Sequence, residues 1–539
     1  TAVTGESLRA TNVLSYADLA RAAAGVTFTE GSPLDQELQI RGVVSVRIDA
    51  PSADPSIGVF IDNAFVGRTG QLNSDFYDID RVEIIRGPQC VVFCKAVVGG
   101  AFSIHTKRPE FEPGGELGVS YGNFNDFKTY GHVTGGLADG LAGRFSFQIA
   151  QRDGFSRDIL NQRDLEDKDT AQFRAQLLYE PQDSDLSARL IFEYSRQEDN
   201  GIHRIGENIQ PDFPGLKPFS QGRAVVAQKR GGLSRRESIS THPTFVGDNE
   251  PTPQMTDKES WALTLNANWQ IADFINLEAV TSFRSADSKS MYSQTGIDPR
   301  NPYNATDTTV PLVFDSIVYE EEDFEQFSQE LNFSYSNPDS RFDVLAGLYF
   351  QHQSIQKDDI FNAHSLPVVF SPTPIFSQTL SGESRWFNNG NNDTFGVFGQ
   401  VGFQFTDELR LTVGGRFTRD EKDGTVQGLS TATGDFFNPG STTPLTPLSP
   451  TFQLGGGFTT DYGDSWNKFT PQGTLEYTPN DDLLVYATVS RGFKGGGFED
   501  TPANPAAATA GFDPENVTNF ELGGKLDFWE GRARVNASV

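Results

Sequence analysis

The feature that most constrains the fold is a series of amphipathic segments that occupies the chain beyond residue 115. Polar and apolar side chains alternate along each segment, as in residues 145–150 (FSFQIA), 173–179 and 261–269. An extended segment of this kind has one apolar and one polar face, because successive side chains of a β-strand point to opposite sides. We count about 14 or 15 such segments of about ten residues each, which is enough for tilted strands to cross a membrane.

The connections between these segments alternate in length. Tight turns such as residues 337–340, 406–408 and 478–482 alternate with long polar excursions. The long excursions cover residues 196–258, 284–322, 351–392, 419–466 and 491–515. Short turns on one side and long loops on the other are typical of outer-membrane β-barrels, in which the turns face the periplasm and the loops face the exterior. A soluble β-sandwich does not alternate so regularly.

Composition agrees with a membrane β-barrel and disfavours other classes. Hydrophobic residues make up only 37% of the 539-residue chain, yet aromatic residues make up 12%, including 44 Phe. A barrel needs few aliphatic residues, because only alternate side chains face lipid, and aromatic residues form its girdles. The formal charge of −29 disfavours a nucleic-acid partner, which requires a basic face. No run of about 20 apolar residues is present, so no transmembrane helix is predicted.

The first part of the chain has a different pattern, with short elements separated by Gly, Pro and Asp. A short helix is predicted from Ser15 to Gly25, with the serine as N-cap and the glycine at C′. Two short strands, residues 82–85 and 101–106, are separated by a loop punctuated by glycine and by Pro88, which cannot donate to a strand ladder. These features predict a compact α+β domain with its own core.

Several motifs in this order resemble those of TonB-dependent outer-membrane receptors. The plug-like motifs are LQIRG (38–42), VFIDN (59–63), RVEIIRGPQ (81–89) and GGAFSIHTKRP (99–109). Two later segments, SRGFKGGGF (490–498) and PENVTNFELG (514–523), resemble a late-barrel signature of the same family. One such match is weak by itself, but matches along nearly the whole chain in the family's order are specific.

The resemblance implies a barrel of roughly 22 antiparallel strands around an N-terminal α+β plug in the lumen. The pattern changes at residues 109–115, so we predict a plug domain over 1–112 and a transmembrane β-barrel over 113–539. Because about 15 strands do not close such a barrel and unpaired backbone in lipid is costly, the C-terminal strands are expected to be missing. The TonB-binding segment is likewise expected upstream of residue 1.

The resemblance also implies a plug–barrel lock formed by charged residues. Arg41 and Arg86 lie at predicted plug strand ends, and the family's matching arginines face glutamates of the barrel wall. The expected partners are Glu330 and Glu521. The alternative is that these are ordinary solvated charges, since exposed ion pairs contribute little to stability.

Residues at the plug apex are the predicted ligand-binding residues. They are Asp54, in the loop over residues 51–55, and Arg68, Thr69 and Gln71. The family's most frequent cargo is a ferric siderophore, and other members take up cobalamin, haem, glycans or nickel complexes. Only 6 His are present, which disfavours haem. No zinc-ligand spacing or calcium-loop pattern is found, so neither a resident metal nor a cofactor is predicted.

Cys90 and Cys94 depart from the family pattern, which usually carries glycine at both positions. An error in the sequence or a pair of buried thiols is the first interpretation. A disulfide in the oxidising periplasm is the second, and a soft-metal site is the third. Replacing two glycines also changes the backbone conformations open to this loop.

Together these features predict a non-enzymatic importer in the bacterial outer membrane. Its predicted partners are TonB, outer-membrane lipid and lipopolysaccharide, and a small-molecule ligand, most favourably a ferric siderophore, with no nucleic acid. The alternative is a non-transporting surface receptor or a scaffold subunit of an envelope complex, with partner proteins of its own. A passive porin is disfavoured because the plug would obstruct it.

Overall fold

A computed structural model describes the protein. The described residues are 2–45, 50–71, 75–88, 98–158, 162–202, 237–238, 254–293, 314–365, 369–370, 373–374, 380–433, 456–529 and 531–539. Cys90 and Cys94 lie outside them. No helix in these ranges is long and apolar enough to cross a membrane.

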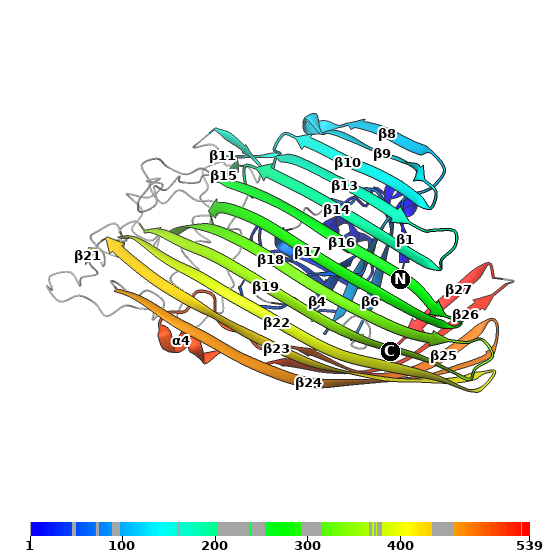
Figure 1. Ribbon diagram of the computed structural model, residues 1–539. Helices are drawn as coiled ribbons and strands as arrows, with labels where there is room; N and C mark the ends of the chain where they lie inside the picture. The colour runs from blue at the N-terminus through cyan, green and yellow to red at the C-terminus, as the bar shows by residue number, and fades with distance from the viewer. Residues whose placement is uncertain are drawn as a thin grey trace.

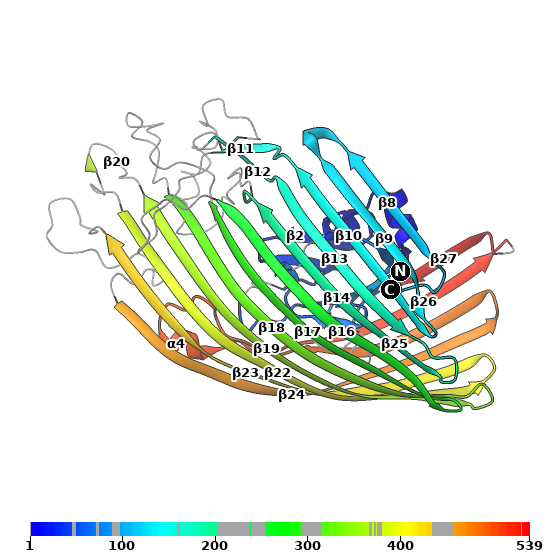
Figure 2. The ribbon, with the colours of Figure 1, turned by 45° about the horizontal axis from the view of Figure 1, so that its top comes forward.

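A 15-stranded antiparallel sheet dominates the molecule, and each strand is hydrogen-bonded to the next one along the chain. The strands are β8 (Gly114–Tyr121), β9 (Phe127–Ala138), β10 (Leu141–Arg152), β13 (Lys168–Tyr179), β14 (Leu186–Asp199), β16 (Met255–Ala272), β17 (Ile275–Ser293), β18 (Phe314–Ser336), β19 (Phe342–Ser365), β22 (Leu380–Thr406), β23 (Leu409–Thr433), β24 (Gly456–Asn480), β25 (Leu483–Lys494), β26 (Glu515–Phe528) and β27 (Ala533–Ser538). The sheet curves around the N-terminal domain, drawn in blue (Figures 1 and 2). The predicted fold class and strand number are therefore confirmed.

The two faces of the sheet differ in polarity, as the alternation predicts. In β10, Arg144, Ser146 and Gln148 are buried toward the plug, whereas Phe145 is exposed on the outer face. Its ring lies 6.5 Å from that of Phe173 on the neighbouring strand. Cross-strand aromatic pairs of this kind stabilise a sheet and cover its apolar surface.

The strands extend further than the sequence pattern predicts. β22 has 27 residues, although about 9–11 residues suffice to cross a membrane. Residues 284–322 were expected to form one long excursion, but β17 continues to Ser293 and β18 begins at Phe314. Here the outward positions carry charge, as in the directly opposed Asp287 and Asp323, so the apolar alternation stops while the hydrogen-bonded ladder continues.

The plug contains a five-stranded sheet in the order β1-β6-β7-β4-β5. Its strands are β1 (Ala2–Thr4), β4 (Ile57–Ile61), β5 (Ala64–Val66), β6 (Ile79–Arg86) and β7 (Gly100–Thr106). Around this sheet lie α1 (Gly5–Ala10), α2 (Tyr16–Ala22), the hairpin of β2 (Val26–Glu30) and β3 (Gln36–Ile40), and η1 (Thr69–Gln71). The core side chains include Leu19, Ile40, Val82, Ile84 and Phe102.

Local sequence features correctly predicted several elements of the plug. The Ser15 hydroxyl accepts a hydrogen bond from the Asp18 amide, as expected of an N-cap. The helix ends earlier than expected, with Ala23 as its C-cap, and Gly25 follows with a φ of +73°. The predicted strands at residues 82–85 and 101–106 fall in β6 and β7, which pair with each other.

The remaining elements lie outside the two main sheets. They are η2 (Asn123–Asn125), β11 (Ser156–Asp158), β12 (Arg163–Leu165), β15 (Glu237–Ser238), β20 (Val369–Phe370), β21 (Thr373–Pro374) and α4 (Pro505–Ala510). α4 belongs to the connection between β25 and β26, which begins at the end of the barrel opposite the tight turns (Figure 1).

Candidate functional site

The interface between the plug and the barrel wall contains several ion pairs. In four of them an aspartate of the plug meets a cation of the wall. The pairs are Asp54–Lys422, Asp62–Arg189, Asp75–Lys168 and Asp78–Arg144. Two further pairs, Arg41–Glu521 and Arg68–Glu322, have the polarity of the predicted lock, with a plug arginine facing a wall glutamate. The overall negative charge of the chain therefore coexists with cations placed on the inner wall.

Asp78 and Arg144 form a bidentate pair. The Arg144 Nε and Nη2 atoms lie 2.8 Å and 2.5 Å from the two carboxylate oxygens, and both side chains are almost fully buried. Burial acts to raise the pKa of Asp78, but hydrogen bonds and charge attraction from Arg144 outweigh it, so the pKa is lowered. Charge-assisted, two-point contacts are among the stronger polar contacts in proteins.

The predicted lock residues occupy three different environments. Arg41 and Glu521 are brought together at 3.4 Å, with Arg41 45% exposed, and the Tyr486 hydroxyl also donates to Glu521. Arg86 donates to the carbonyl of Ala24 inside the plug at 3.0 Å.

Glu330 accepts a hydrogen bond from Asn332 on the same strand at 2.8 Å. Within the described part of the chain, it forms no ion pair with Arg41 or Arg86. The structure therefore brings together one predicted plug–wall pair, and the lock roles of Arg86 and Glu330 remain predictions.

The predicted ligand-binding residues are engaged in contacts of their own. Arg68 is buried, pairs with Glu322 of β18 at 3.1 Å and donates to the carbonyl of Ala50 at 3.0 Å. The Thr69 hydroxyl donates to the carbonyl of Gln36. Asp54 is buried against Lys422. The side chain of Gln71 lies outside the described residues, and a ligand role for these residues stays a prediction.

Lys422 is a central contact that sequence analysis did not identify. Its Nζ donates to the carbonyl of Ser52 at 2.6 Å, the carboxylate of Asp54 at 2.7 Å and the carbonyl of Gly496 at 2.8 Å. The ammonium also lies 5.7 Å from the Trp466 ring centroid. One buried cation thus joins the wall, the plug apex and the connection after β25. Its inward position in β23 is readable from the alternation, but its partners are not.

Side chains of the wall also bind backbone groups of the plug. Gln326 donates to the carbonyl of Phe65 at 2.7 Å and accepts from the amide of Gly67 at 3.0 Å. Lys258 donates to the carbonyl of Gly70 at 2.6 Å. Because these contacts satisfy buried backbone groups, separating the plug from the wall leaves those groups unpaired until water reaches them.

The connection after β25 packs over the plug apex. The Ser52 hydroxyl donates to the carbonyl of Phe498 at 3.0 Å, and the Phe498 amide donates back to that hydroxyl at 2.7 Å. Further along, the Trp386 indole donates to the carbonyl of Pro502 at 2.9 Å. This connection therefore contacts both the plug and the wall.

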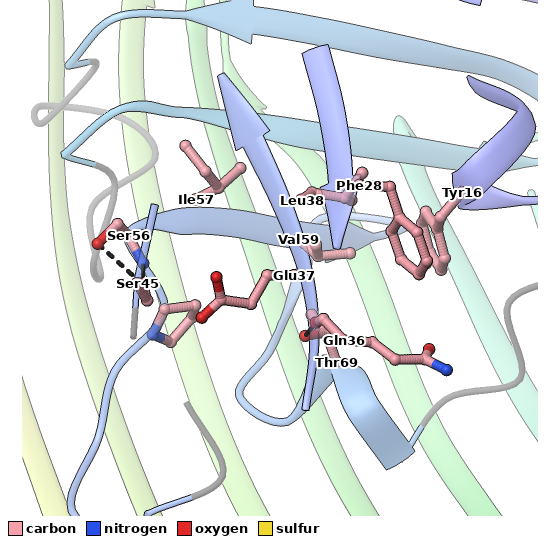
Figure 3. A pocket seen from close by; sticks show the side chains of 11 residues that line it. Tyr16, Phe28, Gln36, Glu37, Leu38, Ser45, Ser56, Ile57, Val59 and Thr69 are labelled. Atoms are coloured by element: carbon pink, nitrogen blue, oxygen red, sulfur yellow. Dashed lines mark hydrogen bonds between the residues drawn. The ribbon is translucent and has the colours of Figure 1, made fainter. Parts of the chain in front are cut away.

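A small pocket lies inside the plug beneath the β2–β3 hairpin (Figure 3). Its apolar end carries Tyr16, Phe28 and Leu38, and its polar end carries Ser45 and Ser56, whose hydroxyls are 2.8 Å apart. A cavity of about 20 Å³ has room for ordered water but not for a nutrient complex. No group of side chains arranged to hold a metal ion occurs among the described residues.

Comparisons with known proteins agree with this architecture. Residues 1–101 match the TonB-dependent receptor plug domain, and residues 214–539 match the TonB-dependent receptor-like β-barrel. The pesticin receptors of Yersinia enterocolitica and Yersinia pestis are 21% and 22% identical over 537 residues, or 98% of the chain. The chain spans 65% of the length of these relatives.

Solved structures share the fold at low sequence identity. The ferric yersiniabactin uptake receptor FyuA from Yersinia pestis has a TM-score of 0.74 at 19% identity, covering 100% of this chain and 71% of its own. The closed form of the ferric-catecholate import receptor Fiu from E. coli has a TM-score of 0.71 at 14% identity, covering 100% and 72%. With a plug, a barrel wall and both family matches, the chain belongs to the TonB-dependent receptors of the bacterial outer membrane.

Proposed function

We propose that the protein imports a ferric siderophore across the outer membrane in a process driven by TonB. The observation that carries this proposal is the plug, a domain with its own core that lies within the curve of the wall and is held there by buried ion pairs. A removable stopper is consistent with regulated passage and inconsistent with a passive pore. The proposal assigns the chain no catalytic reaction and no cofactor.

The energetics of the interface explain why energy input is needed. Removing one partner of a buried ion pair typically costs about 3–5 kcal/mol. Asp54, Asp62 and Asp78 each have a buried cationic partner. Separating these pairs before water enters would leave each buried charge uncompensated, and mechanical pulling by TonB on a segment upstream of residue 1 would supply the work.

Cargo is expected to bind on the exterior side, between the plug apex and the long connections. The apex residues proposed to meet it are Asp54, Arg68, Thr69 and Gln71. For Arg68 and Asp54 this requires exchange of a wall partner for the ligand, since both are paired in this structure. Such an exchange would couple binding to loosening of the plug, because a ligand shifts an equilibrium only through differential contacts.

The siderophore class is supported by relatives rather than by any recognisable binding residue. FyuA and Fiu are described as receptors for ferric yersiniabactin and ferric catecholate. Both structures match the whole of this chain with the same fold. Because their sequence identity to it is below 20%, they do not specify which siderophore this protein binds.

A deletion strain tests the proposal. Loss of the gene is expected to reduce growth under iron limitation and to abolish uptake of at least one labelled ferric siderophore. The full-length gene should restore uptake only in cells with functional TonB. Wild-type uptake of every siderophore tested, together with no iron-dependent growth defect, would remove the siderophore from the proposal.

A second candidate is a non-transporting surface receptor or a scaffold subunit of an envelope complex. It is supported by relatives named pesticin receptors and by a neighbouring structure described as an FpvAI–pyocin S2 complex, with a TM-score of 0.63. The same deletion strain separates the candidates. Resistance to a protein toxin, or loss of a co-purifying envelope protein, with iron uptake unchanged would favour this second role.

A further inference from the structure

Arg284 is a buried cation without a full set of partners. It points inward from β17 and is only 5% exposed. Its one charged contact is the Glu193 carboxylate, at 3.8 Å, and it makes no hydrogen bond within the described part of the chain. A guanidinium has five N–H donors, and leaving them unmet in a buried place is unfavourable.

Glu193 does not neutralise Arg284 by itself, because it is shared. Arg174 donates to Glu193 Oε1 through Nε at 3.0 Å and through Nη2 at 2.9 Å. Two arginines therefore face one carboxylate. Asp75 also borders the space but is ion-paired with Lys168. Among the described side chains named here, the balance is one positive charge without a carboxylate of its own.

These side chains line a cavity between the plug and the wall. Its volume is about 60 Å³, and Tyr16 and Tyr77 of the plug face Gln172, Arg174 and Arg284 of the wall across it. One water molecule occupies roughly 10–15 Å³ of such a cavity volume, so this cavity can hold a few water molecules or one small anion. It is separate from the pocket of Figure 3, although Tyr16 borders both.

Other donors reach the same cavity. The Gln172 side-chain nitrogen is buried with no hydrogen-bond partner in the described structure. The hydroxyls of Tyr16 and Tyr77 make no hydrogen bond to the described residues either. Burial raises the pKa of both tyrosines, so each hydroxyl keeps its proton and can donate.

We propose that this cavity binds a small carboxylate anion, with the Arg284 guanidinium as its main partner and Gln172, Tyr16 and Tyr77 as further donors. A carboxylate matches the planar fork of an arginine and offers two oxygens to the surrounding donors. A bound anion supplies the missing negative charge at the junction of plug and wall. It would therefore stabilise the seated plug, and this holds whether or not the protein imports a siderophore.

Acetate titration of the purified, detergent-solubilised protein tests the site. Ionic strength is held constant with a bulky sulfonate that does not fit the cavity. The thermal unfolding temperature should rise with acetate and saturate. In Arg284→Met the half-saturating acetate concentration should increase at least tenfold, and in Tyr16→Phe or Gln172→Leu it should increase several-fold.

Arg189→Met is the matched control, since Arg189 is also a buried, inward wall arginine but is already paired with Asp62 at 2.6 Å. It should lower the unfolding temperature yet keep the acetate-dependent rise. If Arg284→Met does not fold, the Tyr16→Phe and Gln172→Leu proteins carry the test. The same rise in wild type and in all three cavity variants would overturn the site. Equal affinity for chloride would overturn the carboxylate assignment.

Discussion

Asp78 of the plug and Arg144 of the wall lie 66 residues apart in sequence and meet in a two-point ion pair that is almost entirely buried. Asp78 precedes β6 with a φ of +50°, and Arg144 points inward from β10. The pair therefore joins the start of a central plug strand directly to the wall. Every conformational change that moves the plug must break this contact or carry it along.

Asp78→Asn should loosen the plug without unfolding the barrel. The substitution leaves Arg144 buried with a neutral partner, and losses of about 3–5 kcal/mol are typical when one member of a buried pair is removed. Hydrogen exchange should become faster at amides of β6 and β7 and stay unchanged in the long wall strands. The control is Asp80→Asn, because Asp80 is half exposed. Equal effects of the two substitutions would contradict the assignment.

The stability of the plug should decrease at acidic pH, because Asp78 becomes protonated there. The pKa of Asp78 in the folded protein lies below the ordinary value of 3.8. Between these two pKa values the unfolded state therefore binds more protons than the folded state. The stabilising contribution is present above about pH 4 and is lost as pH falls through the folded pKa. The stability difference between wild type and Asp78→Asn, measured by plug hydrogen exchange, should be constant at neutral pH and shrink in acid. A difference that grows in acid would contradict this sign.

Lys422 and Asp54 should behave as a coupled unit. Lys422→Met removes the donor to Ser52, Asp54 and Gly496, and Asp54→Asn removes only the charge partner. Each single change is expected to be strongly destabilising, by roughly 3 kcal/mol, but the double change should cost clearly less than their sum. Denaturant unfolding of the four proteins measures the coupling. Additive effects would show that the two charges do not interact.

Arg41→Ala should have a much smaller effect. Arg41 is 45% exposed and 3.4 Å from Glu521, and exposed ion pairs contribute about 0–1 kcal/mol. Plug hydrogen exchange should change little, and the remaining effect should fade at high salt. Glu521→Gln is the informative companion, because Glu521 also accepts from Tyr486. If Arg41→Ala loosened the plug as much as Asp78→Asn, burial would not determine how much each ion pair stabilises the plug.

Part of this architecture was readable from local pattern alone. The alternation in β10 and β13 assigned inner and outer faces, because a strand has a period of two whatever it pairs with. The N-cap at Ser15 and the two strands that contain Ile84 and Phe102 followed from short-range rules, whereas the pairing of these strands is seen only in the structure. The sequence pattern did not predict the outer ends of the long strands. Charged residues such as Asp287 and Asp323 face outward there, so the apolar alternation is lost although the backbone hydrogen bonds between the strands continue.

The amino-acid sequence by itself determined that a compact α+β domain precedes an amphipathic barrel wall, because both follow from local periodicity and turn chemistry. The place of that domain inside the wall was implied only by the family resemblance. The contacts between plug and wall were decided only in the tertiary structure. Lys422 and Asp54 are separated by 368 positions, and Glu330 accepts a hydrogen bond from Asn332 of its own strand. Which charges meet depends on the stagger of the wall strands and on how the plug is seated, and the local sequence around a charge specifies neither.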